Sequence, residues 1–119
     1  MTQSLFERLG GEDGIRQIAS DLVDIHLQNP TINHRYIDSD IKKVKNGAAT
    51  FFITGTGGPN VYEGKDMVGT HRGMNISNDE FMAVLDDVVK ALKKNNIGQR
   101  EQEEVLFTFF SMKDEVVRQ

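Results

Sequence analysis

The chain has 119 residues and no cysteine, with 38% hydrophobic residues, 27% charged residues and a formal net charge of −4 at pH 7. This length and composition predict one globular domain spanning residues 1–119, large enough to bury a core. The negative charge disfavours nucleic acid as a partner, and the lack of cysteine excludes disulfides, thiolate metal sites and cysteine nucleophiles.

The first half of the chain is predicted to begin with two helices. Ser4 and Glu7 have the spacing of a capping box, and a diglycine follows directly, so a very short helix is expected before residue 10. Apolar residues then recur every three or four positions from about residue 12 to residue 29, which indicates a long amphipathic helix. Pro30 prevents this helix from continuing.

Three more helices are predicted further along the chain. One runs from about Ile41 to about Gly55 and is followed by a loop rich in glycine and proline. Ser77 and Glu80 have the spacing of a second capping box and begin another helix. The last helix carries one apolar stripe, made of Val105, Phe109, Met112 and Val116. With no alternating segment of strand length, the fold class is predicted to be all-α, with about five helices.

The segment between Gly55 and Ile76 is too rich in glycine for a long helix. Each glycine inside a helix costs ~1 kcal/mol relative to alanine. Any helix around His71 must therefore be short and must be held by something other than helix propensity. A bound cofactor is one candidate.

The histidines are the only strong metal-ligating side chains besides the carboxylates, and they stand alone at positions 26, 34 and 71. Zinc sites need three or four protein ligands at close spacing, which this pattern does not offer. Haem needs only one axial imidazole and a crevice lined by apolar and aromatic side chains. An ordinary surface or core histidine is the alternative interpretation of His71. Aromatic residues available for such a crevice are Tyr36, Phe51, Phe52, Tyr62, Phe81, Phe107 and Phe109.

Three stretches together resemble the truncated haemoglobins, and most closely their first group. These stretches are LFERLGGEDGI near the start, FFITGTGGPNVYEGKDM in the middle and THRGMNIS after it. They are similar to the opening helix with its diglycine, to the phenylalanine pair with the second glycine motif, and to the proximal histidine segment. The resemblance covers nearly the whole chain and implies a two-over-two helical sandwich around haem.

The resemblance also implies roles for individual residues. His71 corresponds to the proximal ligand of the iron of haem b, with its other ring nitrogen donating to a backbone carbonyl. Lys45, Lys65 and Arg72 are candidates to meet the haem propionates, although solvated surface charges would look the same. The resemblance assigns haem contacts, which plain core packing would mimic, to Tyr36, Val44, Ala48, Phe51, Phe52, Tyr62, Met67, Ile76, Phe81 and Val84.

The distal side departs from the family pattern. First-group members usually place a tyrosine where this chain has Val23, and glutamine often stands at the positions of Val44 and Ala48. Tyr36 is then the best candidate for a polar distal group, while His26 is expected at the edge of the pocket or outside it. The distal pocket is expected to comprise Leu22, Val23, Tyr36, Val44 and Ala48.

The resemblance predicts a haem protein that reversibly binds oxygen, nitric oxide or carbon monoxide and is not primarily an enzyme. An electron-donating reductase is the expected partner if the bound gas is turned over. The alternative is a globin-fold sensor or interaction module, with or without haem. No signal-peptide pattern opens the chain and no apolar run reaches 18 residues, so a monomeric, cytoplasmic protein that does not insert into membranes is expected.

Overall fold

The computed structural model describes residues 3–119, which form helices joined by turns and loops. The all-α prediction is confirmed, since the only β pairing among the described residues is an isolated bridge between Ile76 and Val117. The elements are α1 (Leu5–Arg8), α2 (Gly11–Gln28), the 3-10 helix η1 (Asn33–Tyr36), α3 (Ile41–Gly55), α4 (Met67–His71), α5 (Asn78–Lys94), α6 (Gln99–Ser111) and α7 (Lys113–Val116).

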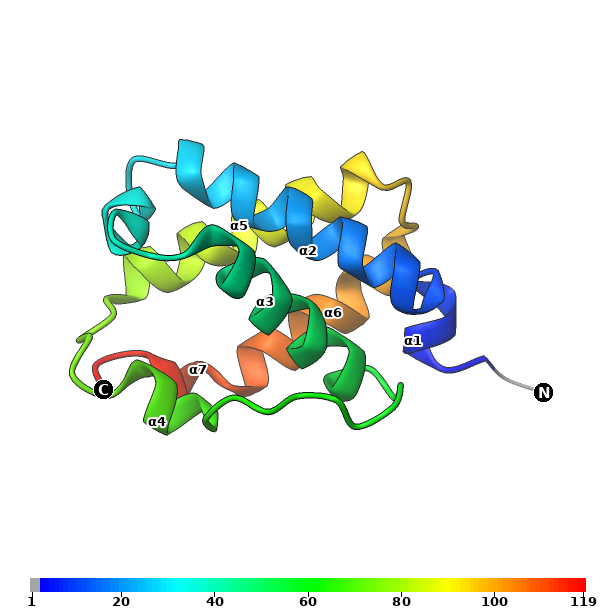
Figure 1. Ribbon diagram of the computed structural model, residues 1–119. Coiled ribbons are helices and arrows are strands. Elements are labelled where there is room, and N and C mark those ends of the chain that lie inside the picture. Colours follow the sequence, from blue (N-terminus) through cyan, green and yellow to red (C-terminus); the bar gives the residue numbers. More distant parts are fainter. Residues whose placement is uncertain (1–2) are drawn as a thin grey trace.

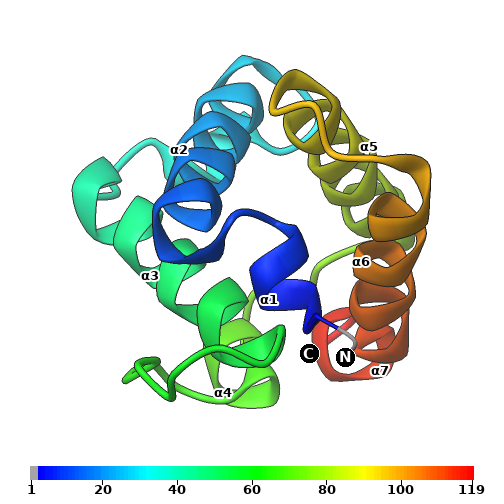
Figure 2. The ribbon, with the colours of Figure 1, turned by 90° about the vertical axis from the view of Figure 1, so that its right-hand side faces the viewer.

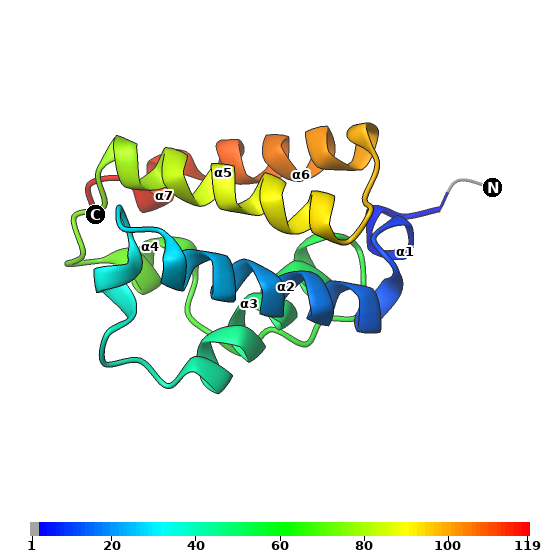
Figure 3. The same cartoon turned by 90° about the horizontal axis from the view of Figure 1, so that it is seen from above.

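The four long helices form two pairs that face each other (Figure 1). Helices α2 and α3 make one layer, and α5 and α6 make the other, as the view along the molecule shows (Figure 2). Seen from above, the two layers are clearly separate, and the short helix α4 lies near one end of the space between them (Figure 3). The predicted two-over-two helical sandwich is therefore confirmed.

Local capping fixes where the longer helices begin. Asp40 starts α3 because its carboxylate accepts hydrogen bonds from the backbone N–H groups of Lys42 and Lys43, at 3.1 and 3.4 Å. The second predicted capping box is complete: the Ser77 hydroxyl accepts from the Glu80 N–H at 3.1 Å, and the Glu80 carboxylate accepts from the Ser77 N–H at 3.2 Å. These caps set the register with which α3 and α5 turn their apolar faces inward.

No helix among residues 3–119 is both long and apolar enough to cross a membrane.

The main core lies where α2 meets α3 and α5. A second, smaller cluster beside α4 and α7 contains Ile76, Phe81, Leu85 and Val116. The main cluster contains Leu9, Ile15, Ile18, Leu22, Phe52, Ile53, Val88, Ala91, Leu92 and Val105.

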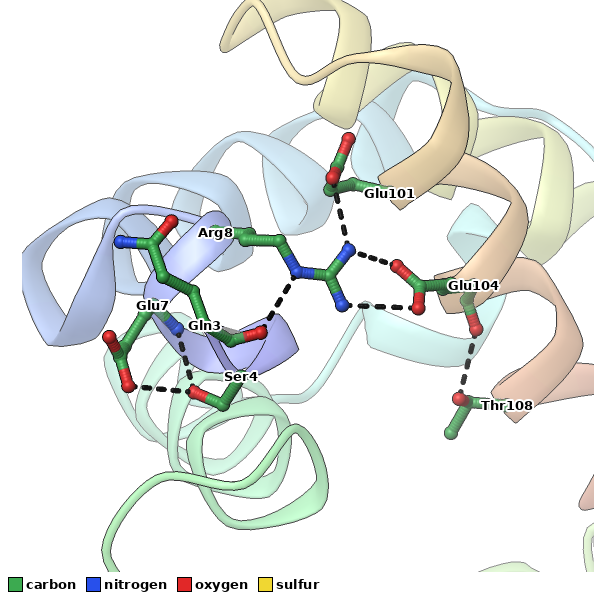
Figure 4. A network of polar contacts seen from close by, with 7 residues as sticks. All are labelled: Gln3, Ser4, Glu7, Arg8, Glu101, Glu104 and Thr108. Carbon is green, nitrogen blue, oxygen red and sulfur yellow. Dashed lines mark hydrogen bonds and ion pairs between the residues drawn. The ribbon is translucent and has the colours of Figure 1, made fainter. Parts of the chain in front are cut away.

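The first helix is short, as predicted, and an ion-pair network docks it on α6 (Figure 4). Gly10 ends it with a backbone φ of 101°, a left-handed conformation that favours glycine. The Arg8 guanidinium donates two hydrogen bonds to the Glu104 carboxylate and one to Glu101, the last at 3.0 Å. These contacts raise the pKa of Arg8, and the contact with Arg8 lowers the pKa of Glu104.

The number of helices is higher than the five predicted. The irregular stretch after Pro30 contains η1, whose single turn has no side-chain cap and no long apolar period to reveal it. The last predicted helix is divided at Met112 into α6 and α7. Its apolar stripe still points inward, because Val116 packs into the smaller core cluster and Met112 lines a cavity.

Candidate functional site

Two adjoining cavities lie between the helical layers on either side of α4. The smaller, of about 280 Å³, is enclosed mainly by η1, α4, α5 and the end of α6. The larger, of about 720 Å³, lies between α2, α3, α4 and the loop that follows α3. Together they form one crevice, because five residues line both of them: Tyr36, Met67, His71, Val84 and Phe109.

The structure brings to this crevice every residue to which the resemblance assigned a haem contact or a place in the distal pocket. Tyr36, Met67, His71 and Val84 line both cavities, and Ile76 and Phe81 line the smaller one. The larger cavity is lined by Leu22, Val23, Val44, Ala48, Phe51, Phe52 and Tyr62. Residues from five separate elements and the segments between them thus meet around His71.

His71 ends the short helix α4, which Asp66 caps by accepting a hydrogen bond from the Gly69 N–H at 2.7 Å. The Nδ1 atom of His71 lies 2.8 Å from the carbonyl oxygen of Met67, the backbone contact that the sequence analysis predicted. A carbonyl oxygen can only accept, so Nδ1 carries the hydrogen and Nε2 of the neutral ring holds a free electron pair. His71 therefore offers one good donor atom for a metal at the junction of the two cavities.

The C-terminal tail holds the segment that follows α4. The Arg118 N–H donates to the Ile76 carbonyl at 2.8 Å, and the Asn75 N–H donates to the Gln119 carbonyl at 2.9 Å. Beside this pairing, α4 lies against α7 (Figure 1). This contact replaces the helix propensity that the glycine-rich segment lacks.

The loop between α3 and α4 is held by side chains rather than by regular structure. The Thr54 hydroxyl accepts hydrogen bonds from the Val61 and Tyr62 N–H groups, at 3.0 and 3.1 Å. The Tyr62 hydroxyl donates to the Lys65 carbonyl at 2.6 Å, and its ring packs edge-on against Phe51 with centroids 5.4 Å apart. The loop thereby forms a fixed wall of the larger cavity.

On α2 and α3, the larger cavity is lined by apolar side chains at the positions where the family resemblance implies polar ones. Val23 is buried and lines the larger cavity together with Val44 and Ala48. The hydroxyl of Tyr36 makes no hydrogen bond to any residue of the described chain. Burial raises the pKa of Tyr36, and the negative charge of Asp87 adds to this effect, so the phenol stays protonated and able to donate at neutral pH.

His26, which was expected at the edge of the pocket or outside it, contributes to the wall of the larger cavity. His26 is only 5% exposed, lines the larger cavity and stacks on Tyr36 with ring centroids 5.9 Å apart and an interplanar angle of 10°. Its Nδ1 atom lies 2.7 Å from a carboxylate oxygen of Asp87, which is fully buried on α5. The sequence could not reveal this pair, because its two members are 61 positions apart.

The charged residues at the crevice were predicted only in part. Lys65 lines the larger cavity, but Lys45 is paired with Asp24 at 2.8 Å, and Arg72 lines neither cavity. Lys42 and Lys43, which the sequence analysis did not single out, line the larger cavity instead. The Asp40 cap places Lys42 and Lys43 in the first turn of α3. No sequence pattern showed that these two residues line the cavity.

Among the aromatic residues, Phe107 does not belong to the crevice. Its side chain is 76% exposed on the outside of α6, while Phe109, two residues later, lines both cavities. Ile32 and Met74 also line the smaller cavity and were not predicted from the sequence. Neither belongs to a predicted helix, so no helical period marked them.

A partly buried ion pair borders the smaller cavity and was also missed. The Arg35 guanidinium donates to both carboxylate oxygens of Glu80, at 2.7 and 2.9 Å, and to the Met74 carbonyl at 2.9 Å. The contact with Arg35 lowers the pKa of Glu80 to about 2. This pair ties η1 to the start of α5 and to the segment after His71.

Comparisons with known proteins agree with this architecture. The chain is 29% identical over 92 residues to the group 1 truncated haemoglobin of Tetrahymena pyriformis, covering 77% of this chain and 76% of the relative. It is 26% identical over 100 residues to a group 1 truncated haemoglobin of Synechocystis, with 81% of each chain covered.

Solved structures show the same fold. The Fe(III) form of the Tetrahymena pyriformis truncated haemoglobin superposes with a TM-score of 0.95 at 24% identity, covering 98% of this chain and 100% of that one. The 2/2 haemoglobin of Synechococcus, in its cyanomet state and with covalently attached haem, gives a TM-score of 0.90 at 21% identity, covering 97% and 98%. A model of the bacterial-like globin family matches residues 4–118. The chain therefore belongs to the bacterial-like globins, with the fold of the truncated haemoglobins.

Proposed function

We propose that the crevice binds haem b and that His71 is the protein ligand of its iron. The observation that carries this proposal is the orientation of His71 at the junction of the two cavities. Its Nδ1 is engaged by the Met67 carbonyl at 2.8 Å, which leaves the Nε2 electron pair available to a metal. Haem, when bound, supplies an iron centre that takes a small gas molecule as a further ligand.

The chemistry of the walls fits a porphyrin. A flat apolar group needs aromatic and aliphatic contacts on both faces, and such side chains line both cavities around His71. Phe51, Phe52 and Phe81 supply aromatic surface for this purpose. Lys42, Lys43 and Lys65, which line the larger cavity, are suited to meet the two carboxylates of the cofactor.

The gas ligand proposed is oxygen, nitric oxide or carbon monoxide, bound reversibly. Val23, Val44 and Ala48 present an apolar wall that admits a small uncharged molecule and offers it no hydrogen bond. The relatives reported above, which are named as haemoglobins, support this reading. Tyr36 and His26 also line this cavity and are the polar side chains proposed to influence the ligand, since the Thr50 hydroxyl donates to the Asn46 carbonyl at 2.9 Å.

An absorption spectrum of the purified protein with added haem tests the proposal. We expect stoichiometric haem uptake with an intense Soret band, and a five-coordinate ferrous form when no gas is present. Failure to take up haem would contradict the proposal and favour a haem-free interaction module. A six-coordinate, low-spin ferrous form without gas would show that a side chain of the chain itself occupies the ligand site.

A further inference from the structure

A buried histidine–carboxylate pair opens onto the larger cavity, and the proposed gas binding makes no use of it. His26 on α2 and Asp87 on α5 lie 2.7 Å apart, and both are buried. The amide of Asn29 donates to both oxygens of the same carboxylate, at 3.2 Å each. Asp87 thus has two donors that hold it in place, and His26 is the only one of them that titrates.

The pair fixes which ring nitrogen of His26 carries the hydrogen. An ionised carboxylate can only accept, so Nδ1 is the donor, and Nε2 of the neutral ring carries the free electron pair. Burial lowers the pKa of His26, and the hydrogen bond to Asp87 only partly opposes this effect, so the ring is neutral at pH 7. The side chain is therefore a base ready to accept a proton.

The free nitrogen faces the larger cavity. No residue of the described chain hydrogen-bonds to Nε2, yet no buried side-chain nitrogen or oxygen among these residues lacks a partner. Nε2 must therefore reach open space, and the larger cavity is the one that His26 lines. Val23, Val44 and Ala48 line this same cavity, so the base and the apolar ligand wall share one space.

We propose that His26, oriented by Asp87, accepts the proton of a weak protic acid HX that enters the larger cavity, so that the site captures the anion X⁻. The ligand class comprises small weak acids such as hydrogen cyanide, hydrogen sulfide and hydrazoic acid. The inference rests on the proposed function, because the haem iron is the acceptor for the anion. What it adds is a residue of this chain, His26, that takes up the proton of such a ligand.

The proton transfer balances without any redox partner. The H–X bond breaks heterolytically, its electron pair stays on X, and a new N–H bond forms at Nε2 of His26. The positive charge that develops on the imidazole is compensated by the Asp87 carboxylate 2.7 Å from Nδ1. Asp87 is a positioning residue in this scheme, since it acts only through the ring of His26.

The test compares two ligands in the haem-loaded protein. Cyanide, added near neutral pH where it is present mainly as hydrogen cyanide, must lose a proton when it binds to the ferric form. Carbon monoxide, which binds to the ferrous form, has no proton to lose. Association rates are measured for the natural chain, for His26→Gln, which keeps a polar side chain but removes the base, and for Asp87→Asn. His34→Gln is the matched control, because it makes the same substitution at an exposed histidine that lines neither cavity.

We expect His26→Gln to slow cyanide association on the order of a hundredfold, the usual contribution of a positioned acid–base group. Asp87→Asn should slow it less, and His34→Gln should leave it unchanged. Carbon monoxide association should change little in all three variants. Equal slowing of both ligands by His26→Gln would indicate altered access to the cavity and would overturn the proposal, as would an unchanged cyanide rate.

A second readout does not depend on ligand binding rates. The nitrogen-15 chemical shifts of His26 in the diamagnetic ferrous carbonmonoxy protein report which ring nitrogen is protonated. We expect the Nδ1–H form in the natural chain and a shift toward the other form in Asp87→Asn. A natural chain with the hydrogen on Nε2 would overturn the inference alone if haem binding is normal. Failure to bind haem at all would overturn both this inference and the proposed function.

Discussion

Val23 illustrates how one side chain can set the behaviour of the whole pocket. It is buried against the larger cavity, at the position where the family resemblance implies a tyrosine. A valine offers no hydrogen bond to a gas molecule. Tyr36 and His26 line the same cavity, as does Thr50, whose hydroxyl donates to the Asn46 carbonyl at 2.9 Å.

Restoring a hydroxyl at this position should slow oxygen release. A hydrogen bond to a group with partial charge contributes ~1.5–3 kcal/mol, which corresponds to roughly a tenfold to hundredfold change in affinity. We therefore expect oxygen to dissociate more slowly from Val23→Tyr by about that factor, measured by stopped-flow, with little change for carbon monoxide. Val23→Phe is the control, because it adds the ring without the hydroxyl.

Tyr36→Phe completes this comparison. Faster oxygen release from this variant would show that the Tyr36 hydroxyl has partly taken over the role of the missing donor. If the natural protein already releases oxygen slowly and Val23→Tyr, Val23→Phe and Tyr36→Phe all leave the rate unchanged, the apolar wall does not control release.

Glu80 should make the stability of the fold depend on pH in the acid range. The contact with Arg35 lowers its pKa from 4.5 to about 2. A lowered pKa means that the stabilisation is present above about pH 4.5 and is lost as the pH falls toward 2. Because the pair is partly exposed to solvent, we expect Glu80→Gln to lower the free energy of unfolding at pH 7 by roughly 1–2 kcal/mol.

Urea unfolding at pH 7 and pH 3 measures this effect. The difference in the free energy of unfolding between the natural chain and Glu80→Gln should narrow at pH 3. At that pH, part of the stabilisation from the Glu80 carboxylate is lost. Glu12→Gln is the control, since Glu12 forms an exposed ion pair with Arg16. A gap that stays constant between the two pH values would contradict the assigned role of Glu80.

Helix α4 is short, and it carries the proposed iron ligand. It has five residues, includes Gly69 and ends in His71. Its conformation depends on the Asp66 cap, on α7 beside it and on the pairing of the C-terminal tail with the segment after His71. The orientation of the proposed iron ligand is therefore set by its neighbours rather than by the helix itself.

Removing the cap of α4 should loosen haem binding selectively. Loss of an N-cap side chain typically costs ~1 kcal/mol, so Asp66→Ala should weaken haem retention by roughly fivefold. Ser77→Ala removes the equivalent cap of α5 and should lower the free energy of unfolding by a similar amount without this effect on haem. Haem transfer to an excess of apomyoglobin measures retention. Equal loss rates for the two variants would contradict a special role for the α4 cap.

At the scale of the whole molecule, the two helical layers matter because of the crevice between them. The α2–α3 pair carries the apolar wall and His26, while the α5–α6 pair carries Phe81, Val84 and Phe109. Helix α4 and the loop before it also line the crevice. No single element contains the site, so the fold must form before the site exists.

The parts of this arrangement that depend on local patterns could be predicted from the sequence. Helical periodicity and capping residues located the four long helices, and the position of His71 in a family-like motif pointed to the crevice. The parts that depend on distant contacts could not be predicted. The His26–Asp87 and Arg35–Glu80 pairs join residues 61 and 45 positions apart. Likewise, no local signal marked the break at Met112, after which α7 lies against α4.

The central claim is that His71 is the protein ligand of a haem iron, and replacing its ring by added imidazole tests this claim most directly. We predict that His71→Gly loses most of its haem or shows an altered ferrous spectrum, and that added imidazole restores the five-coordinate spectrum of the natural chain. His34→Gly, which changes an exposed histidine, should leave the spectrum unchanged. A normal five-coordinate ferrous spectrum of His71→Gly without imidazole would contradict the claim.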